Sequence, residues 1–313
     1  MTGKILSGRR FLGGICRKSL KNHWKFADFK VYSIKITKYV QLIGKATKKM
    51  KLCMMSCMMP YSTPEEIVEA AVYCGMTAID WISTHNTDPA LLRKISEDAG
   101  LTIAAHTMLK EKFLNYDDSY MDDFKSSLDD AVTLGAPIMM LPPFPRKGNT
   151  TMAEDRKAWI EYYQQAYPLA KAAGVILTAE STGYHNSPIT TADEVLELLT
   201  AVPGLKLTFD HGNTATADDP VAAYHKLKDF VVHMHLKDWK VYDTPQADTT
   251  LKRNGKHFAD MIIGEGDMDI KTFWDQVDAR GKELYVNLET RDFSEKLAPR
   301  EALKKVSDLL RNW

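Results

Sequence analysis

The chain has 313 residues, of which 44% are hydrophobic and 26% charged, and this length fits one large domain or two average ones. No apolar run approaches the ~20 residues that a membrane-spanning helix needs, so we expect no membrane segment. The four cysteines show neither paired zinc-site spacing nor a secretory context. Reduced thiols in a cytoplasmic protein are therefore expected.

The formal net charge of zero hides a strong asymmetry between the first fifty residues and the rest. Residues 1–50 hold thirteen Lys or Arg and a single acid, Asp28, so the remainder carries a balance of −12. Such a basic segment is typical of a targeting sequence or a nucleic-acid-binding arm. The third interpretation is an extension without a fold of its own. We favour this one and expect residues 1–49 to lie outside a catalytic domain of residues 50–313.

Short apolar runs alternate with amphipathic stretches from residue 51 onward. The runs are rich in β-branched residues, and they predict eight strands. These lie near Leu52–Met58, Ala78–Trp81, Thr102–His106, Pro137–Leu141, Val175–Glu180, Leu205–Asp210, Val231–Leu236 and Leu284–Glu289. Apolar strands that alternate with helices indicate a parallel sheet covered by helices.

The helical stretches between the strands carry start and stop signals. Thr63 precedes Pro64, and Thr191 is followed three residues later by Glu194, as at helix N-termini. Glycines that close helices precede most of the strands. Eight such units in roughly 260 residues predict a closed (β/α)8 barrel, or TIM barrel, with an open doubly wound sheet as the alternative.

Four of the predicted strands end in a side chain that can bind a metal. Glu180 ends VILTAE, Asp210 ends LKLTFD, His235 lies in VVHMHLKD, and Glu289 ends LYVNLE. A carboxylate at the end of a buried strand costs free energy unless something pairs with it. Because active sites of such barrels lie at the carboxyl ends of the strands, we predict that the four side chains bind one divalent metal ion.

This donor set also suggests a chemistry. Two Glu, one Asp and one imidazole favour Mn²⁺ or Mg²⁺ and leave Co²⁺ and Zn²⁺ open. Glu180 and Glu289 are the predicted catalytic pair: one removes a proton next to a sugar carbonyl while the metal stabilises the enediolate. Return of the proton from the opposite face inverts the carbon, whereas return to the neighbouring carbon interconverts aldose and ketose. A single such Glu is as well explained by a salt bridge, but four together are not.

Residues 51–313 resemble the sugar phosphate isomerase/epimerase superfamily of xylose-isomerase-like barrels. This group includes ketose 3-epimerases, hydroxypyruvate isomerase, inosose dehydratase and endonuclease IV. The likeness rests on three strand-end acids and two motifs, namely Glu180, Asp210, HMHLKD (233–238), GEGDMD (264–269) and Glu289. The resemblance implies one divalent metal held by these three acids and His235. In the epimerase members, the two Glu positions also form the acid/base pair.

The chain departs from the endonuclease IV pattern, which carries extra histidines for three zinc ions. Asn213 stands three residues after Asp210, and the fourth strand ends in LPPFP without histidine. The negative charge of residues 51–313 would also repel a phosphate backbone. We therefore expect no nucleic-acid partner.

Six further residues near the predicted strand ends are candidates for substrate binding: Trp81, His106, His185, Asn213, Lys237 and Arg291. Trp81 and His106 have an equally good alternative as core residues, and Lys237 as a loop salt bridge. His233 shares a strand face with His235 and is expected to pack beneath it. The long connection from Lys237 to Asp269 is either a lid or specificity loop, or a disordered insert.

The leading hypothesis is thus a metal-dependent isomerase or epimerase of a sugar, keto-sugar or sugar phosphate. One alternative is a lyase, such as a dehydratase acting on an inosose or keto-sugar, because the same enediolate can expel a β-hydroxyl group. Another is a barrel that binds carbohydrate without turnover. The expected partner is a small-molecule sugar, and self-association into a homo-oligomer is compatible with the sequence.

Overall fold

The computed structural model describes residues 50–292, 294 and 296–313. The prediction for residues 1–49 therefore lies outside the described residues. The strands are β1 (Lys51–Met55), β2 (Ala78–Ile82), β3 (Thr102–Thr107), β4 (Ile138–Met140), β5 (Ile176–Glu180), β6 (Lys206–Asp210), β7 (Val231–Tyr242), β8 (Thr250–Leu251), β9 (His257–Met261) and β10 (Tyr285–Glu289). The helices are α2 (Pro64–Tyr73), α3 (Pro89–Asp98), α4 (Glu111–Leu114), α5 (Tyr120–Leu134), α6 (Met152–Ala172), α7 (Ala192–Ala201), α8 (His211–Thr214), α9 (Pro220–Leu227), α10 (Ile270–Gln276) and α11 (Pro299–Leu310).

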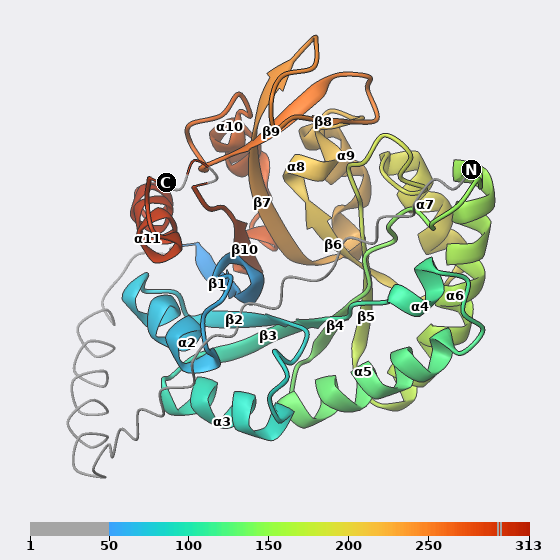
Figure 1. Ribbon diagram of the computed structural model, residues 1–313, viewed down its shortest axis with the longest axis horizontal. Helices are drawn as coiled ribbons and strands as arrows, with labels where there is room; N and C mark the ends of the chain where they lie inside the picture. Colours follow the sequence, from blue (N-terminus) through green and yellow to red (C-terminus); the bar gives the residue numbers. More distant parts are fainter. Residues whose placement is uncertain (1–49, 293, 295) are drawn as a thin grey trace, which may run out of the picture.

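Eight parallel strands form a closed ring. They follow one another in the order β10, β1, β2, β3, β4, β5, β6 and β7, and β10 pairs with β7 to close it. The longer helices lie around the outside of this ring (Figure 1). The prediction of a TIM barrel is therefore confirmed, and the open doubly wound sheet is excluded.

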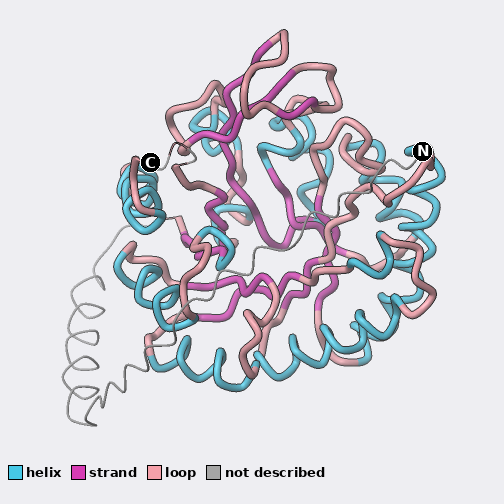
Figure 2. The backbone as a smooth tube through the Cα atoms, viewed as in Figure 1, coloured by secondary structure: helices cyan, strands magenta, loops and turns pink. Residues whose placement is uncertain are grey.

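The core fills the space between the ring of strands and the surrounding helices. Ile79 and Leu207 from the strands and Leu92 and Val195 from the helices belong to one buried apolar cluster. Burying such a side chain contributes about 1.5–3 kcal/mol each. This two-layer arrangement is clear in Figure 2, where the strands lie inside and the helices outside.

The predicted helix starts are confirmed as side-chain caps. Thr63 and Glu66 form a reciprocal capping box at α2, and Thr191 and Glu194 form another at α7. Asp88 accepts a hydrogen bond from the backbone N–H of Ala90 at the start of α3. These contacts satisfy backbone donors that the first helical turn leaves without partners.

Two barrel strands end more than one residue away from their predicted carboxyl ends. The first ends at Met55, because Ser56–Met58 turn into a 3-10 helix and the Ser56 hydroxyl accepts the backbone N–H of Ile82 at 2.8 Å. The seventh continues to Tyr242, because its second half pairs antiparallel with β9. The connection after Lys237 is therefore an ordered β arm formed by the end of β7 with β8 and β9, and not a disordered insert. This arm projects from the ring at the top of Figure 1.

Asp238 fastens the base of this arm to the turn that leads into α10. Its buried carboxylate accepts hydrogen bonds from the backbone N–H groups of Trp239, Gly264, Gly266 and Met268, at 2.8–3.2 Å. A Cβ atom at Gly266 would lie 2.2 Å from the Asp238 carboxylate, so only glycine fits there. The HLKD and GEGDMD motifs are thus two halves of one contact.

Among the described residues, no helix combines the length and the apolar character needed to cross a bilayer.

Candidate metal centre

Strand register brings the predicted ligands to one height in the barrel. Asp210 on β6 lies beside His235 on β7, and Asn287 on β10 lies on the other side of His235. Because side chains alternate along a strand, Glu289 projects to the same face as Asn287, one layer further out. The ends of four neighbouring strands therefore point to one place.

The four predicted ligands do converge. One ligand atom from each of Glu180, Asp210, His235 and Glu289 lies within 4.8 Å of the others. His235 Nδ1 is 2.7 Å from Glu180 Oε1 and 2.8 Å from Glu289 Oε1. Three of the four residues are at most 5% exposed, and the Glu289 side chain is 13% exposed. We call these four residues the metal centre.

Lys237 adds a positive charge at the edge of the metal centre. Its Nζ lies 2.5 Å from Glu289 Oε2 and 3.4 Å from Asp210 Oδ2. The second oxygen of Asp210 accepts the backbone N–H of Asn213 at 2.7 Å, which fixes the orientation of that carboxylate. Lys237 thus forms a salt bridge, as in the alternative interpretation, but with ligands of the metal centre; its role in substrate binding stays a prediction.

The pKa shifts of its residues indicate that the metal centre attracts positive charge. Burial alone would lower the pKa of His235, but Glu180 and Glu289 raise it well above its ordinary value. Burial would raise the pKa of Glu289, but Lys237 and His235 hold it well below its usual range. At Asp210, burial is the larger effect, and it raises the pKa to about 7 against the attraction of Lys237.

The residues present fit a bound divalent cation. Glu180 Oε1 is buried and accepts no hydrogen bond from the described residues, and its charged neighbour is His235 Nδ1 at 2.7 Å. Such an oxygen is costly to bury unless a cation or a strong donor meets it. Three carboxylates and one imidazole, each offering one atom, are a sufficient ligand set for Mg²⁺, Mn²⁺ or Zn²⁺.

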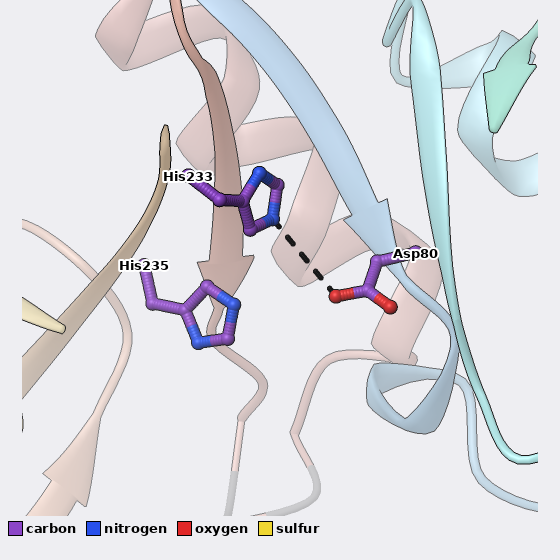
Figure 3. A group of neighbouring side chains, drawn as sticks. All are labelled: Asp80, His233 and His235. Carbon is purple, nitrogen blue, oxygen red and sulfur yellow. Dashed lines mark ion pairs between the residues drawn. The ribbon is translucent and has the colours of Figure 1, made fainter. Parts of the chain in front are cut away.

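A polar layer lies directly beneath the metal centre, deeper in the barrel. Figure 3 shows Asp80 from β2 facing His233 and His235 from β7, with 3.9 Å between His233 Nε2 and Asp80 Oδ2. Burial lowers the pKa of His233 to about 3, so its imidazole is neutral and this contact is not between two charges. His233 thus packs below His235, as expected from the alternation.

Asn287 links this layer to His235. Its Nδ2 lies 2.8 Å from Asp80 Oδ2 and 2.9 Å from His235 Nε2. In the neutral ring, an amide that donates to Nε2 places the His235 proton on Nδ1, where it faces Glu180 and Glu289. A cation held at Nδ1 would require the proton on Nε2 instead, and Asn287 would then have to turn its Oδ1, which is buried without a hydrogen-bond partner, toward Nε2 to accept it.

Two of the predicted substrate-binding residues lie elsewhere. Trp81 is fully buried, and its Nε1 donates to Ser96 on α3. His106 Nδ1 lies 2.9 Å from the carbonyl oxygen of Trp81, and Nε2 lies 3.0 Å from Ser127 on α5. Both side chains face the outer helices and not the metal centre, because they lie on the outward side of β2 and β3. Their alternative as core residues agrees with this placement.

The remaining predicted residues lie at the rim. Asn213 is buried beside the metal centre, donates its Nδ2 to the carbonyl of Ser181 at 3.0 Å, and lies 3.4 Å from Lys237 Nζ through its Oδ1. His185 is exposed on the loop that follows β5. Arg291 is half-buried just beyond the end of β10. Of the six candidates, the structure brings Lys237 and Asn213 into contact with the ligands.

Sequence reasoning missed three buried charged residues: Asp80 beneath the metal centre, and Lys110 and Lys252 at the rim of the barrel. For Asp80 a signal existed, because it is an acid inside the apolar run AIDWI. Burial raises its pKa to about 6, against the opposing attraction of His235. Lys110 and Lys252 lie in segments rich in charge, where neither the composition nor the spacing marks them.

Comparison with known proteins places these features in context. The sequence model of a family described as "Xylose isomerase-like TIM barrel" matches residues 68–313. No curated protein matches this chain significantly in sequence. Many solved structures resemble it at low sequence identity, which speaks for the fold alone.

Three of these structures have informative descriptions. A 3-keto-D-glucoside 4-epimerase from E. coli in its apo form is 15% identical, with a TM-score of 0.67 over 85% of this chain and 100% of its own. A probable 3-DHS dehydratase from Bacillus anthracis is 18% identical, with a TM-score of 0.64 over 83% and 98%. The IOLI protein with a bound zinc atom is 16% identical, with a TM-score of 0.66 over 83% and 97%.

Proposed function

We propose that this chain, which belongs to the xylose isomerase-like TIM barrel family, is a divalent-metal-dependent isomerase or epimerase of a sugar or sugar derivative. The observation that carries the proposal is the meeting of Glu180 and Glu289 at one imidazole, each within 2.8 Å of His235 Nδ1. The two carboxylates come from β5 and β10, which are separated in the ring by β6 and β7. They therefore approach the site from different sides.

Two carboxylates in this position suit proton transfer at carbon. One Glu takes the proton from the carbon next to a carbonyl, and the electron pair moves to the carbonyl oxygen as an enediolate. The other Glu gives a proton to the opposite face and so inverts the carbon. Proton transfer by positioned side chains contributes about 10²–10⁴-fold in rate.

Glu180, Asp210, His235 and Glu289 are the residues that would hold the cation. When bound there, it would polarise the substrate carbonyl and offset the charge that develops on oxygen. We propose Mn²⁺ or Mg²⁺ because three of the four donors are carboxylates, and the zinc atom in the IOLI protein keeps Zn²⁺ as an alternative. Lys237 contributes a fixed positive charge beside Glu289.

A lyase is the second candidate, supported by the similar structure described as a probable dehydratase. The same removal of a proton would then be followed by loss of a β-hydroxyl as water. Product analysis separates the two, because loss of water lowers the product mass and forms a conjugated carbonyl that absorbs ultraviolet light.

The proposal is tested by incubating the full chain with a panel of sugars and keto-sugars in deuterated water, with and without Mn²⁺. We expect metal-dependent incorporation of solvent deuterium at one carbon, measured by NMR and mass spectrometry. Glu180→Gln and Glu289→Gln should each lower the incorporation by at least about 10²-fold, because one partner of the proton relay is then neutral.

The matched control is Glu161→Gln on α6. The Glu161 side chain is 58% exposed and is not one of the ligands of the metal centre. This variant should leave incorporation unchanged. Full incorporation in both Glu180→Gln and Glu289→Gln would contradict the assigned roles. Saturable sugar binding without any deuterium incorporation would instead indicate a binding protein.

We also propose a cytoplasmic location and a small sugar as the partner. Cys53, Cys57 and Cys74 are free thiols, and Cys53 and Cys74 are buried, which suits a reducing compartment.

A further inference from the structure

Lys110 is a buried lysine just after the end of β3. It is 2% exposed, and its Nζ makes a single long hydrogen bond of 3.4 Å to the carbonyl of Met108. The ammonium also lies over the ring of Phe144, 4.8 Å from its centroid. No carboxylate of the described residues lies within ion-pair distance of this ammonium. Glu180 of the metal centre is the acid whose charge acts on it.

Lys252 is a second buried lysine, on the β arm. It is 6% exposed, and its ammonium lies over two rings, 4.5 Å from the Trp239 centroid and 5.0 Å from the Tyr184 centroid. Within the described part of the chain, it too lacks an ion-pairing carboxylate. The acids whose charges act on it from a distance are Asp260 on β9, and then Asp210 and Glu289 of the metal centre.

Aromatic rings join the two lysines into one continuous row. Phe144, under Lys110, packs edge-on against Tyr184 at 5.8 Å, and Tyr184 lies under Lys252. Trp239 then connects Lys252 to Lys237, whose Nζ is 5.3 Å from the indole centroid. Lys237 touches the metal centre directly. We call Lys110, Phe144, Tyr184, Lys252 and Trp239 the lysine–aromatic row.

The positive charges of this row are not balanced by their surroundings. Burial lowers the pKa of Lys110 to about 7 and that of Lys252 to about 8. Both values are close to neutral pH, so each amine is only just able to stay protonated. A ring face attracts an ammonium, but less than burial disfavours it. An anion that binds beside the lysine ammonium groups would supply the missing partner, and it would also make charge-assisted hydrogen bonds.

We propose that the lysine–aromatic row binds a negatively charged group of the substrate, a carboxylate or a phosphate, while the reacting carbon lies at the metal centre. This inference rests on the proposed function and narrows it to sugar acids or sugar phosphates. The ring faces of Phe144, Tyr184 and Trp239 offer apolar surface to the carbon skeleton, and Lys110 and Lys252 select for charge.

The experiment is calorimetric titration of the full chain loaded with Mn²⁺. Four probes are used: inorganic phosphate, D-fructose 6-phosphate, D-gluconate and the uncharged D-fructose. We expect a charged probe to bind at least tenfold more tightly than D-fructose. Phosphate-bearing probes and D-gluconate distinguish a phosphate site from a carboxylate site.

Lys110→Met and Lys252→Met keep the aliphatic stem and remove the charge. Each should weaken binding of the preferred anion by about 10- to 100-fold, as expected for loss of a charge-assisted hydrogen bond. Affinity for Mn²⁺ should not change, which also shows that the variants are folded. The control is Lys157→Met, whose side chain is 80% exposed on α6.

The proposal is overturned if D-fructose binds as tightly as the charged probes, or if both methionine variants keep wild-type affinity for them. It is also overturned if none of the charged probes binds. In that case, the proposed function would still be supported if the wild type incorporates deuterium into an uncharged sugar and Glu180→Gln does not. The two ideas therefore fail separately.

Discussion

The Asp80 carboxylate lies one layer below the metal centre and reaches His235 through a single amide group. It accepts a hydrogen bond from Asn287 at 2.8 Å and one from Thr107 at 3.3 Å, and it is fully buried. A negative charge behind a ligating imidazole raises the basicity of the ring and so strengthens the nitrogen that faces a cation. Asp80 is therefore expected to set how readily His235 accepts a metal.

Replacing Asp80 by Asn tests this role with little change in volume. We expect Asp80→Asn to weaken Mn²⁺ affinity by about 10- to 100-fold, because the negative charge behind His235 is lost. Calorimetric titration of the full chain with Mn²⁺ measures the effect. Asp98→Asn on α3, where the side chain is 64% exposed, is the control. Equal affinities in the wild type and Asp80→Asn would show that the amide of Asn287 alone orients His235.

At the level of strands and turns, Asp238 holds the β arm and the turn before α10 together. Four backbone N–H groups point to one buried carboxylate, so any loss of acceptor strength leaves donors without partners. The contact explains why an acid at the end of HLKD and glycines in GEGDMD occur together in this chain.

We expect Asp238→Asn to lower the free energy of unfolding by about 2–4 kcal/mol, because a neutral amide replaces a charged acceptor of several hydrogen bonds. Urea denaturation followed by circular dichroism measures it. The same substitution at Asp243, whose side chain is 86% exposed on the arm, should cost less than about 0.5 kcal/mol. A similar small effect at both positions would show that the turn forms without the clamp.

Strand faces mark where prediction from the sequence succeeds and where it fails. Glu180, Asp210 and Glu289 could be predicted because each is the last residue of a strand-like run, and His235 because it lies near the end of one. In a closed barrel, these ends meet. Trp81 and Asp80 could not be assigned to a face, since a shift of one residue exchanges inside and outside. The register between β2 and β3 does shift, between Ile79 and Asp80. It places Asp80 inside with Thr107, and Trp81 and His106 outside.

The lysines of the rim lay beyond prediction for a different reason. Lys110 and Lys252 are buried only because loops far apart in the sequence fold over them, and the aromatic rings beside them come from three separate segments. No periodicity encodes such contacts. Caps and strand runs are local, whereas the path of a loop depends on the finished barrel.

For the molecule as a whole, buried neutral imidazoles make the free energy of unfolding depend on pH. His106 is nearly fully buried between β3 and α5, and burial lowers its pKa to about 4. The unfolded chain binds a proton at this residue near pH 6.5, and the folded chain does so only near pH 4. The contribution of neutral His106 to stability is therefore complete above pH 6.5 and is lost as the pH falls toward 4.

The variant His106→Asn isolates this effect. The difference in unfolding free energy between wild type and variant should shrink by about 2 kcal/mol between pH 7.5 and pH 5, because only the wild type must keep this imidazole neutral. Urea denaturation at a series of pH values measures it. His225→Asn, at an exposed position on α9, should show a difference that does not vary with pH to this extent. A constant gap at His106 would mean that the folded protein accommodates the charged ring.

One unbroken strand, β7, carries both His235 and the base of the β arm. Adding or removing a single residue between His235 and Lys237 would turn Lys237 away from Glu289 and Asp238 away from its four donors. Length can vary without that penalty farther out, around residues 243–248, where the side chains are exposed. The tip of the arm can therefore become longer or shorter. The length of its base is fixed, because Lys237 and Asp238 must keep their positions relative to His235.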